Sequence, residues 1–96
     1  MIIGICKIKL RIPQKASLKD KRRALKSIIA QLKNKLNISV AEVEDQELWQ
    51  LATLGICCVS NDSRLSNEVL SRAVNFLNTG RFDVELLDYN IEIISF

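Results

Sequence analysis

The sequence contains no histidine, only one proline and three cysteines among its 96 residues. Without histidine there is no histidine general base, Ser-His-Asp triad or histidine-ligated zinc, which excludes the commonest routes to hydrolysis and metal chemistry. The cysteines Cys6, Cys57 and Cys58 lack CxxC spacing and are odd in number, so they support neither a disulfide framework nor a metal cluster. No apolar run reaches the roughly eighteen residues that span a bilayer. We expect a single cytoplasmic domain over residues 1–96, with no catalytic activity, cofactor, metal or membrane partner.

Charge is distributed unevenly along the chain. Residues 1–37 carry eleven Lys and Arg against one Asp, a net charge of +10. Residues 38–96 carry three Arg against ten Asp and Glu, a net charge of −7. This asymmetry fits either a basic face that binds nucleic acid or two halves of the fold that compensate each other.

Hydrophobic periodicity predicts secondary structure in the order βαββαβ. Strands are expected over residues 2–12, 38–43, 49–60 and 82–94, and amphipathic helices over residues 17–36 and 63–79. Ser17 is the expected N-cap of the first helix, and Gly80 is expected to end the second. The last strand alternates in two phases that a bulge near Leu86 and Leu87 would reconcile. The order is that of an α+β ferredoxin-like sandwich, a four-stranded antiparallel sheet of order 4-1-3-2 with both helices on one face.

The sharpest local signal is a basic cluster around the first turns of the first helix: Lys15, Lys19, Lys21, Arg22, Arg23 and Lys26. Exposed cations near a helix N-terminus are unfavourable by roughly 0.3–1 kcal/mol each, so helix stability does not explain them. Flexible cations beside free backbone N–H groups attract phosphates, which predicts a nucleic-acid contact. The alternative is a solvated basic face compensated by the acidic half, with Arg22 or Arg23 bridged to the acidic residues 42–47.

The sheet face turned away from the helices is a second candidate surface, which we call the open face. Its predicted interface residues are Ile3, Ile5, Leu51, Thr53, Cys57 and Val59. This apolar set suggests a homodimer formed through the sheet. The face also carries cations, but neither central strand has the interior aromatic on which RNA-binding sheets stack bases. We expect these cations to pair across strands: Lys7 with Glu92, Lys9 with Asn90 and Arg11 with Asp88.

Two further features favour structural interpretations. The acidic residues 42–47 have neither a histidine nor a second acidic motif to complete a metal site. Trp49, which follows them, is expected to anchor the core or an interface. Cys6 and Cys58 are expected to act as small core hydrophobes.

Three stretches together resemble the YlxP-like family of small bacterial proteins. They are Ser-Leu-Lys-Asp-Lys-Arg-Arg at 17–23, Ser-Val-Ala-Glu-Val-Glu-Asp-Gln-Glu-Leu-Trp-Gln at 39–50 and Cys-Val-Ser-Asn-Asp at 58–62. The resemblance covers essentially the whole chain and implies a ferredoxin-like domain of unknown function. Genes of this family often lie beside translation and ribosome-maturation genes, which implies RNA or ribosome association. Leu51 and the Cys57–Cys58 pair depart from the usual family pattern, which argues against RNA binding by the open face.

The sequence thus predicts, first, a non-catalytic RNA- or ribosome-associated module that binds through the basic start of the first helix. The alternative is a homodimeric protein-interaction or small-ligand regulatory domain that uses the open face. Salt-dependent retention of RNA would distinguish the first function from the second.

Overall fold

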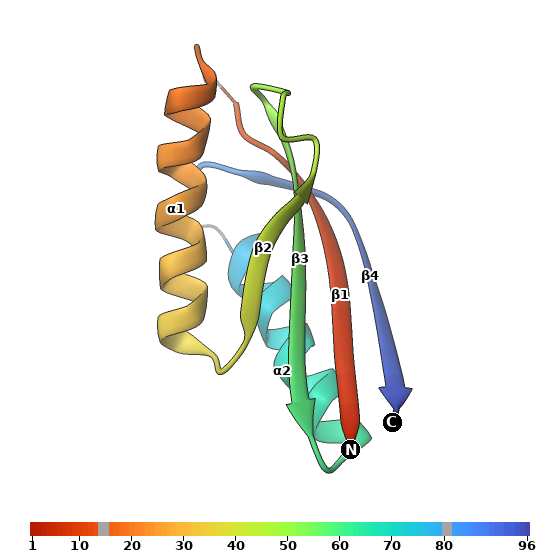
Figure 1. Cartoon of the computed structure of the whole chain (residues 1–96). Coiled ribbons are helices and arrows are strands. Elements are labelled where there is room, and N and C mark those ends of the chain that lie inside the picture. Colours follow the sequence, from red (N-terminus) through yellow and green to blue (C-terminus); the bar gives the residue numbers. More distant parts are fainter. Residues whose placement is uncertain (14–15, 80–81) are drawn as a thin grey trace.

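The computed structural model describes residues 1–13, 16–79 and 82–96. Its elements are β1 (Ile2–Arg11), α1 (Leu18–Lys35), β2 (Ser39–Glu44), β3 (Leu51–Ser60), α2 (Ser63–Asn78) and β4 (Glu85–Ser95). The strands form one antiparallel sheet in the order β2-β3-β1-β4 (Figure 1), which is the predicted order 4-1-3-2 seen from the other edge. The ferredoxin-like fold is therefore confirmed. Within the described ranges, no helix has the length and apolar character needed to cross a membrane.

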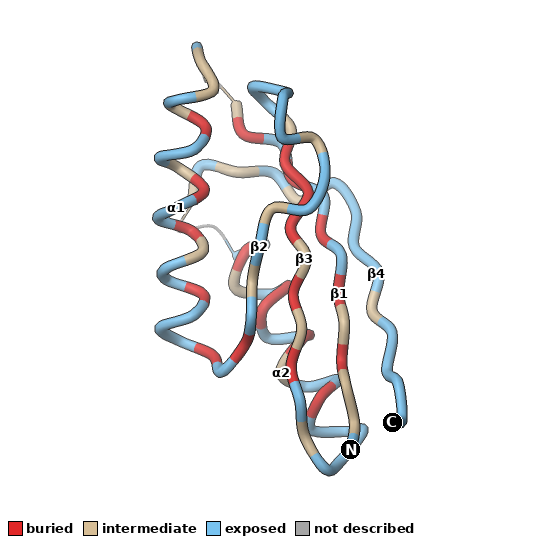
Figure 2. The backbone as a smooth tube through the Cα atoms, viewed as in Figure 1, coloured by how far each residue is buried: buried red, intermediate tan, exposed pale blue. Residues whose placement is uncertain are grey.

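The core lies between the sheet and the two helices. Figure 2 shows the buried side of α1 turned toward the strands. The strands contribute alternate side chains: Cys6, Ile8 and Leu10 from β1, and Ala52, Leu54, Ile56 and Cys58 from β3. The helices contribute Leu25, Ile28 and Leu32 from α1, and Leu70, Ala73 and Leu77 from α2. These positions match the predicted periods of two residues in strands and three to four in helices.

Local hydrogen bonds define the helix starts as the sequence predicts. Ser17 Oγ accepts a hydrogen bond from the Asp20 N–H at 3.1 Å, which makes Ser17 the N-cap of α1. Asp62 caps α2 in the same way by accepting from the Arg64 N–H at 2.9 Å. Gly80, the predicted end of α2, lies outside the described residues.

The pairing of β1 with β4 confirms the predicted bulge but not the predicted register. The partner jumps from Asp88 to Leu86 between Lys9 and Leu10, so Leu87 is the extra residue. The expected cross-strand pairs are wrong by two positions or more, since the observed pairs are Lys7 with Asn90, Lys9 with Asp88 and Arg11 with Glu85. Both registers place Ile91 and Ile93 on the helix side of the sheet, since in the observed register they lie opposite Cys6 and Gly4. The observed register also joins the chain ends, where the Phe96 N–H donates to the Met1 carbonyl oxygen at 2.8 Å.

Candidate nucleic-acid interface

Basic side chains form a stripe along one side of α1, which we call the basic face: Lys19, Arg22, Arg23, Lys26 and Lys33. Their spacing places them within about 100° of the helix circumference and along about 21 Å of its axis, given 3.6 residues per turn and 1.5 Å rise per residue. All five are exposed, and Figure 2 shows the outer side of α1 open to solvent. Four of them are predicted members of the cluster. The fifth, Lys33, was not predicted, although its spacing of seven residues from Lys26 places it on the same side of the helix. Lys15, which was predicted, lies outside the described residues.

Lys21 does not belong to the basic face, so its predicted contact with phosphate is wrong. Its side chain is 0% exposed, and its Nζ lies 2.8 Å from Glu42 Oε2. The same Nζ donates a hydrogen bond to the Asp45 carbonyl oxygen at 2.7 Å. Position 21 lies one helical turn before the buried Leu25, and therefore on the side of α1 that faces the strands.

The acidic residues near the end of β2 pair with cations outside the basic face. The pairs are Glu42 with Lys21 at 2.8 Å, Glu44 with Lys7 at 2.8 Å and Asp45 with Lys9 at 3.8 Å. The hydrogen bond to Glu44 raises the pKa of Lys7 above its ordinary value. Within residues 1–13, 16–79 and 82–96, neither Arg22 nor Arg23 forms an ion pair, so the alternative bridge to this acidic tract is not observed.

A shallow groove of about 490 Å³ lies beside the basic face, between α1 and β2. Its cationic members are Arg22, Lys26 and Lys33, its apolar members are Leu25, Ile29 and Ala30, and Glu42 lines it from β2. Because β2 is an edge strand, no further strand among the described residues covers this side. Cations along the α1 side of a partly apolar groove suit a partner that carries phosphates next to less polar groups.

The open face holds the predicted interface residues, with one correction. Ile3, Ile5, Leu51 and Cys57 are half-buried, and Val59 is 65% exposed. Thr53 is fully buried and donates its hydroxyl hydrogen bond to Asp45 Oδ2 at 2.6 Å. Thr53 therefore does not line a free surface, because a register shift near the end of β2 brings Asp45 over it.

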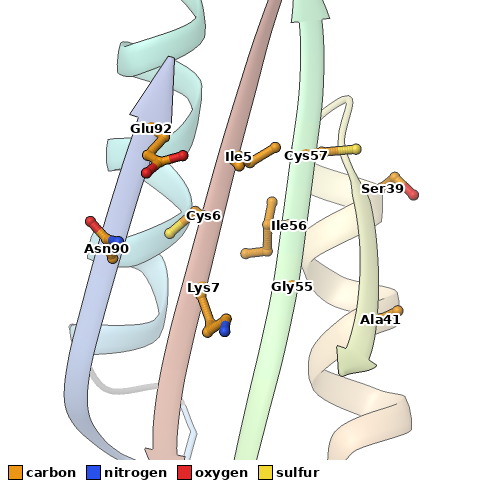
Figure 3. Close-up of a pocket in the computed structure, with 10 residues that line it drawn as sticks. All are labelled: Ile5, Cys6, Lys7, Ser39, Ala41, Gly55, Ile56, Cys57, Asn90 and Glu92. Atoms are coloured by element: carbon orange, nitrogen blue, oxygen red, sulfur yellow. The ribbon is translucent and has the colours of Figure 1, made fainter. Parts of the chain in front are cut away.

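A groove of about 550 Å³ crosses the open face. Figure 3 shows Ile5 and Cys57 near its middle, with Glu92 on β4 and Ser39 on β2 at its two sides. Ile5 and Cys57 are directly paired across β1 and β3. The groove thus combines an apolar middle with polar margins, an arrangement suited to contact with another surface.

The two cysteines on the core side of the sheet, Cys6 and Cys58, are poorly placed to react as nucleophiles. Cys6 and Cys58 are buried, as predicted, whereas Cys57 is half-buried on the open face. Burial raises the pKa of the Cys6 thiol to about 11, so Cys6 stays protonated near neutral pH. Across the part of the chain that the structure describes, no group of three or more His, Cys, Asp or Glu side chains is placed to hold a metal ion.

The turn between β2 and β3 exposes two large apolar side chains, one of which was expected to anchor the core or an interface. Trp49 is 52% exposed and Leu48 is 45% exposed, so Trp49 does not anchor the core. Gln46, Glu47 and Gln50 around them are also exposed. Polar residues on both sides of Leu48 and Trp49 are the one signal in the sequence that favours a solvent-facing turn.

Comparison with known proteins identifies the family. A family model described as protein of unknown function (DUF503) matches residues 3–91. The chain belongs to this family. It is 33% identical over 78 residues to the uncharacterized protein YlxP of Bacillus subtilis (strain 168), across 81% of this chain and 85% of that relative, which confirms the YlxP-like resemblance.

A solved structure supports the fold independently. The de novo designed protein Foldit4 matches with a TM-score of 0.53 over 97% of both chains. Its sequence identity to this chain is 15%, so the likeness concerns the fold alone. The family description assigns no activity, and the absence of catalysis therefore stays a prediction.

Proposed function

We propose that this chain is a non-catalytic RNA- or ribosome-associated module that binds phosphates through the basic face of α1. The observation that carries the proposal is a stripe of five exposed cations for which the described residues provide no acidic partner. Like charges three and four residues apart on a helix repel each other by a few tenths of a kcal/mol per pair. Binding of an anionic partner offsets this repulsion between the cations of the basic face.

The mode of binding follows from the chemistry of the stripe. Each Lys or Arg that neutralises a phosphate releases condensed counterions, so affinity depends on salt and little on base sequence. A stripe of about 21 Å is long enough to meet several consecutive phosphates. The adjacent groove offers Ile29 and Ala30 for contact with sugars or bases.

Recovery of the tagged protein from its own cells tests this function. We expect RNA or ribosomal particles to accompany the protein at low salt and to be lost after nuclease treatment or at high salt. A variant with Arg22→Ala and Arg23→Ala should recover less RNA under the same conditions. Recovery of protein partners that nuclease leaves unchanged, with no RNA present, would contradict the proposal.

The open face supports a second candidate, a homodimer formed through the sheet. Val59 is 65% exposed there, and the apolar middle of the groove contains Ile5 and Cys57. The groove also contains both Lys7 and Glu92. In a twofold-symmetric dimer, the Lys7 ammonium of one copy can therefore lie opposite the Glu92 carboxylate of the other.

Charge substitution on the open face should separate such a dimer. Ile5→Glu or Cys57→Asp is expected to shift the protein from dimer to monomer in sedimentation experiments without unfolding it, because a buried unpaired carboxylate is costly at an interface. Asn67→Glu, an exposed position on α2, is the matched control and should leave the oligomeric state unchanged. A wild-type protein that stays monomeric at high micromolar concentration would eliminate this candidate.

A further inference from the structure

Trp49 is the only tryptophan of the chain, and the turn between β2 and β3 leaves it 52% exposed. It lines a shallow cavity of about 460 Å³ together with Arg11, Leu48, Gln50 and Leu51. The cavity therefore combines a large aromatic ring, a guanidinium group and a side-chain amide. Aromatic rings and guanidinium planes stack on unpaired bases, and side-chain amides hydrogen-bond to base edges.

Hydrogen bonds and a defined backbone conformation fix the turn that carries Trp49. Asp45 adopts a φ of 63°, a left-handed conformation that is uncommon for a residue other than glycine. Four hydrogen bonds support the segment: Lys21 Nζ to Asp45 O at 2.7 Å, Leu48 N to Asp45 O at 3.1 Å, Thr53 Oγ1 to Asp45 Oδ2 at 2.6 Å and Ile12 N to Gln50 O at 2.8 Å. An aromatic ring on a preorganised turn loses less conformational entropy on binding than one on a loose loop.

The turn also lies beside the start of the basic face. Lys21 of α1 contacts Glu42 and Asp45, and Figure 1 shows the turn and the N-terminal end of α1 at the same end of the molecule. Arg11 pairs with Glu85 at 3.6 Å, but both side chains are more than half exposed. Such a surface pair is weak, so Arg11 is free to turn toward a phosphate.

We infer that Trp49 is the stacking platform for an unpaired base of single-stranded RNA, with Arg11 beside it for the adjacent phosphate. This inference rests on the proposed function and names the part of the RNA that is recognised. A base is favoured over a protein side chain because the cavity contains a cation and lies beside the phosphate-binding stripe on α1. Stacking on one aromatic ring strengthens binding by about 5- to 150-fold.

The test uses an oligoadenylate and the same strand with abasic residues in place of the bases. Binding is read by the anisotropy of a labelled strand, and stacking by quenching of the fluorescence of Trp49, which no other tryptophan obscures. We expect quenching by oligoadenylate and not by the abasic strand. Trp49→Ala should weaken oligoadenylate binding by about 5- to 150-fold and leave binding of the abasic strand unchanged, while Trp49→Phe retains most of the affinity.

Tyr89 on β4 is the matched control, because it is an aromatic side chain of similar exposure, 50%, that does not line the cavity of Trp49. Tyr89→Ala should bind oligoadenylate as the wild type does. Binding without quenching, unaffected by Trp49→Ala, would overturn this inference and leave the proposed function standing. Failure of the wild type to bind either strand at low salt would overturn both. Loss of self-association in Trp49→Ala, with no change in RNA binding, would assign the turn to a protein contact and also overturn the inference.

Discussion

Replacing Lys21 with methionine is expected to lower the free energy of unfolding by about 3 kcal/mol. The Lys21 side chain is 0% exposed, and its removal leaves the largely buried Glu42 carboxylate without its cation. It also removes one of two hydrogen bonds to the Asp45 carbonyl oxygen, the other being donated by the Leu48 N–H. For a domain of this size the loss corresponds to a decrease in Tm of roughly 12–24 °C, which thermal unfolding followed by circular dichroism would measure.

Two controls separate the ion pair from a general effect of losing charge. The double variant Lys21→Met with Glu42→Leu should recover most of the stability, because apolar groups replace both members of a buried pair. Arg22→Met, at the next position but exposed, should change stability by less than about 0.5 kcal/mol. Equal stability of Lys21→Met and the wild type would show that the ion pair does not hold the β2–β3 turn against α1.

Replacing Arg22 and Arg23 together with alanine is expected to weaken RNA binding on the order of tenfold at low salt. The loss should be similar for strands of different sequence, because phosphate contacts carry no base information. The slope of log affinity against log salt concentration should flatten by about 0.7 to 1 for each lost contact. Anisotropy of a labelled strand over a range of salt concentrations measures both effects.

The same variant should keep or slightly raise the Tm. Alanine is a good helix former, and its introduction removes cations from the unfavourable end of the helix dipole. Arg64→Ala with Arg72→Ala is the matched control, since it removes two exposed arginines from α2. A decrease in Tm with unchanged RNA affinity would instead mean that Arg22 and Arg23 serve the fold.

The fold was predictable because its signals are local. The alternation in β1, the three- and four-residue spacing in α1 and the caps Ser17 and Asp62 lie within short windows of sequence. The bulge at Leu87 was also predictable, since the change of phase occurs within one strand. The register of β4 against β1 was not, because two registers place Ile91 and Ile93 on the same side of the sheet and the pairing of Met1 with Phe96 joins opposite ends of the chain.

The presence of a basic cluster on α1 was predictable from the sequence. Which of the predicted site residues are exposed and which are buried was not. Lys21 belongs to a run of basic residues, and only its place one turn before Leu25 separates it from the others. The burial of Thr53 depends on Asp45, which reaches it through a left-handed turn and a shift of strand register. Such contacts depend on tertiary structure, and composition or periodicity does not encode them.

The salt dependence of single-stranded RNA binding by the wild-type protein tests the central claim most directly. If all five cations of the basic face contact phosphates, the slope of log affinity against log salt concentration should lie near −3.5, given about −0.7 per contact on a single strand. Affinity should then fall roughly hundredfold over a fourfold rise in salt concentration. A slope near zero, or no binding at low salt, would contradict the account.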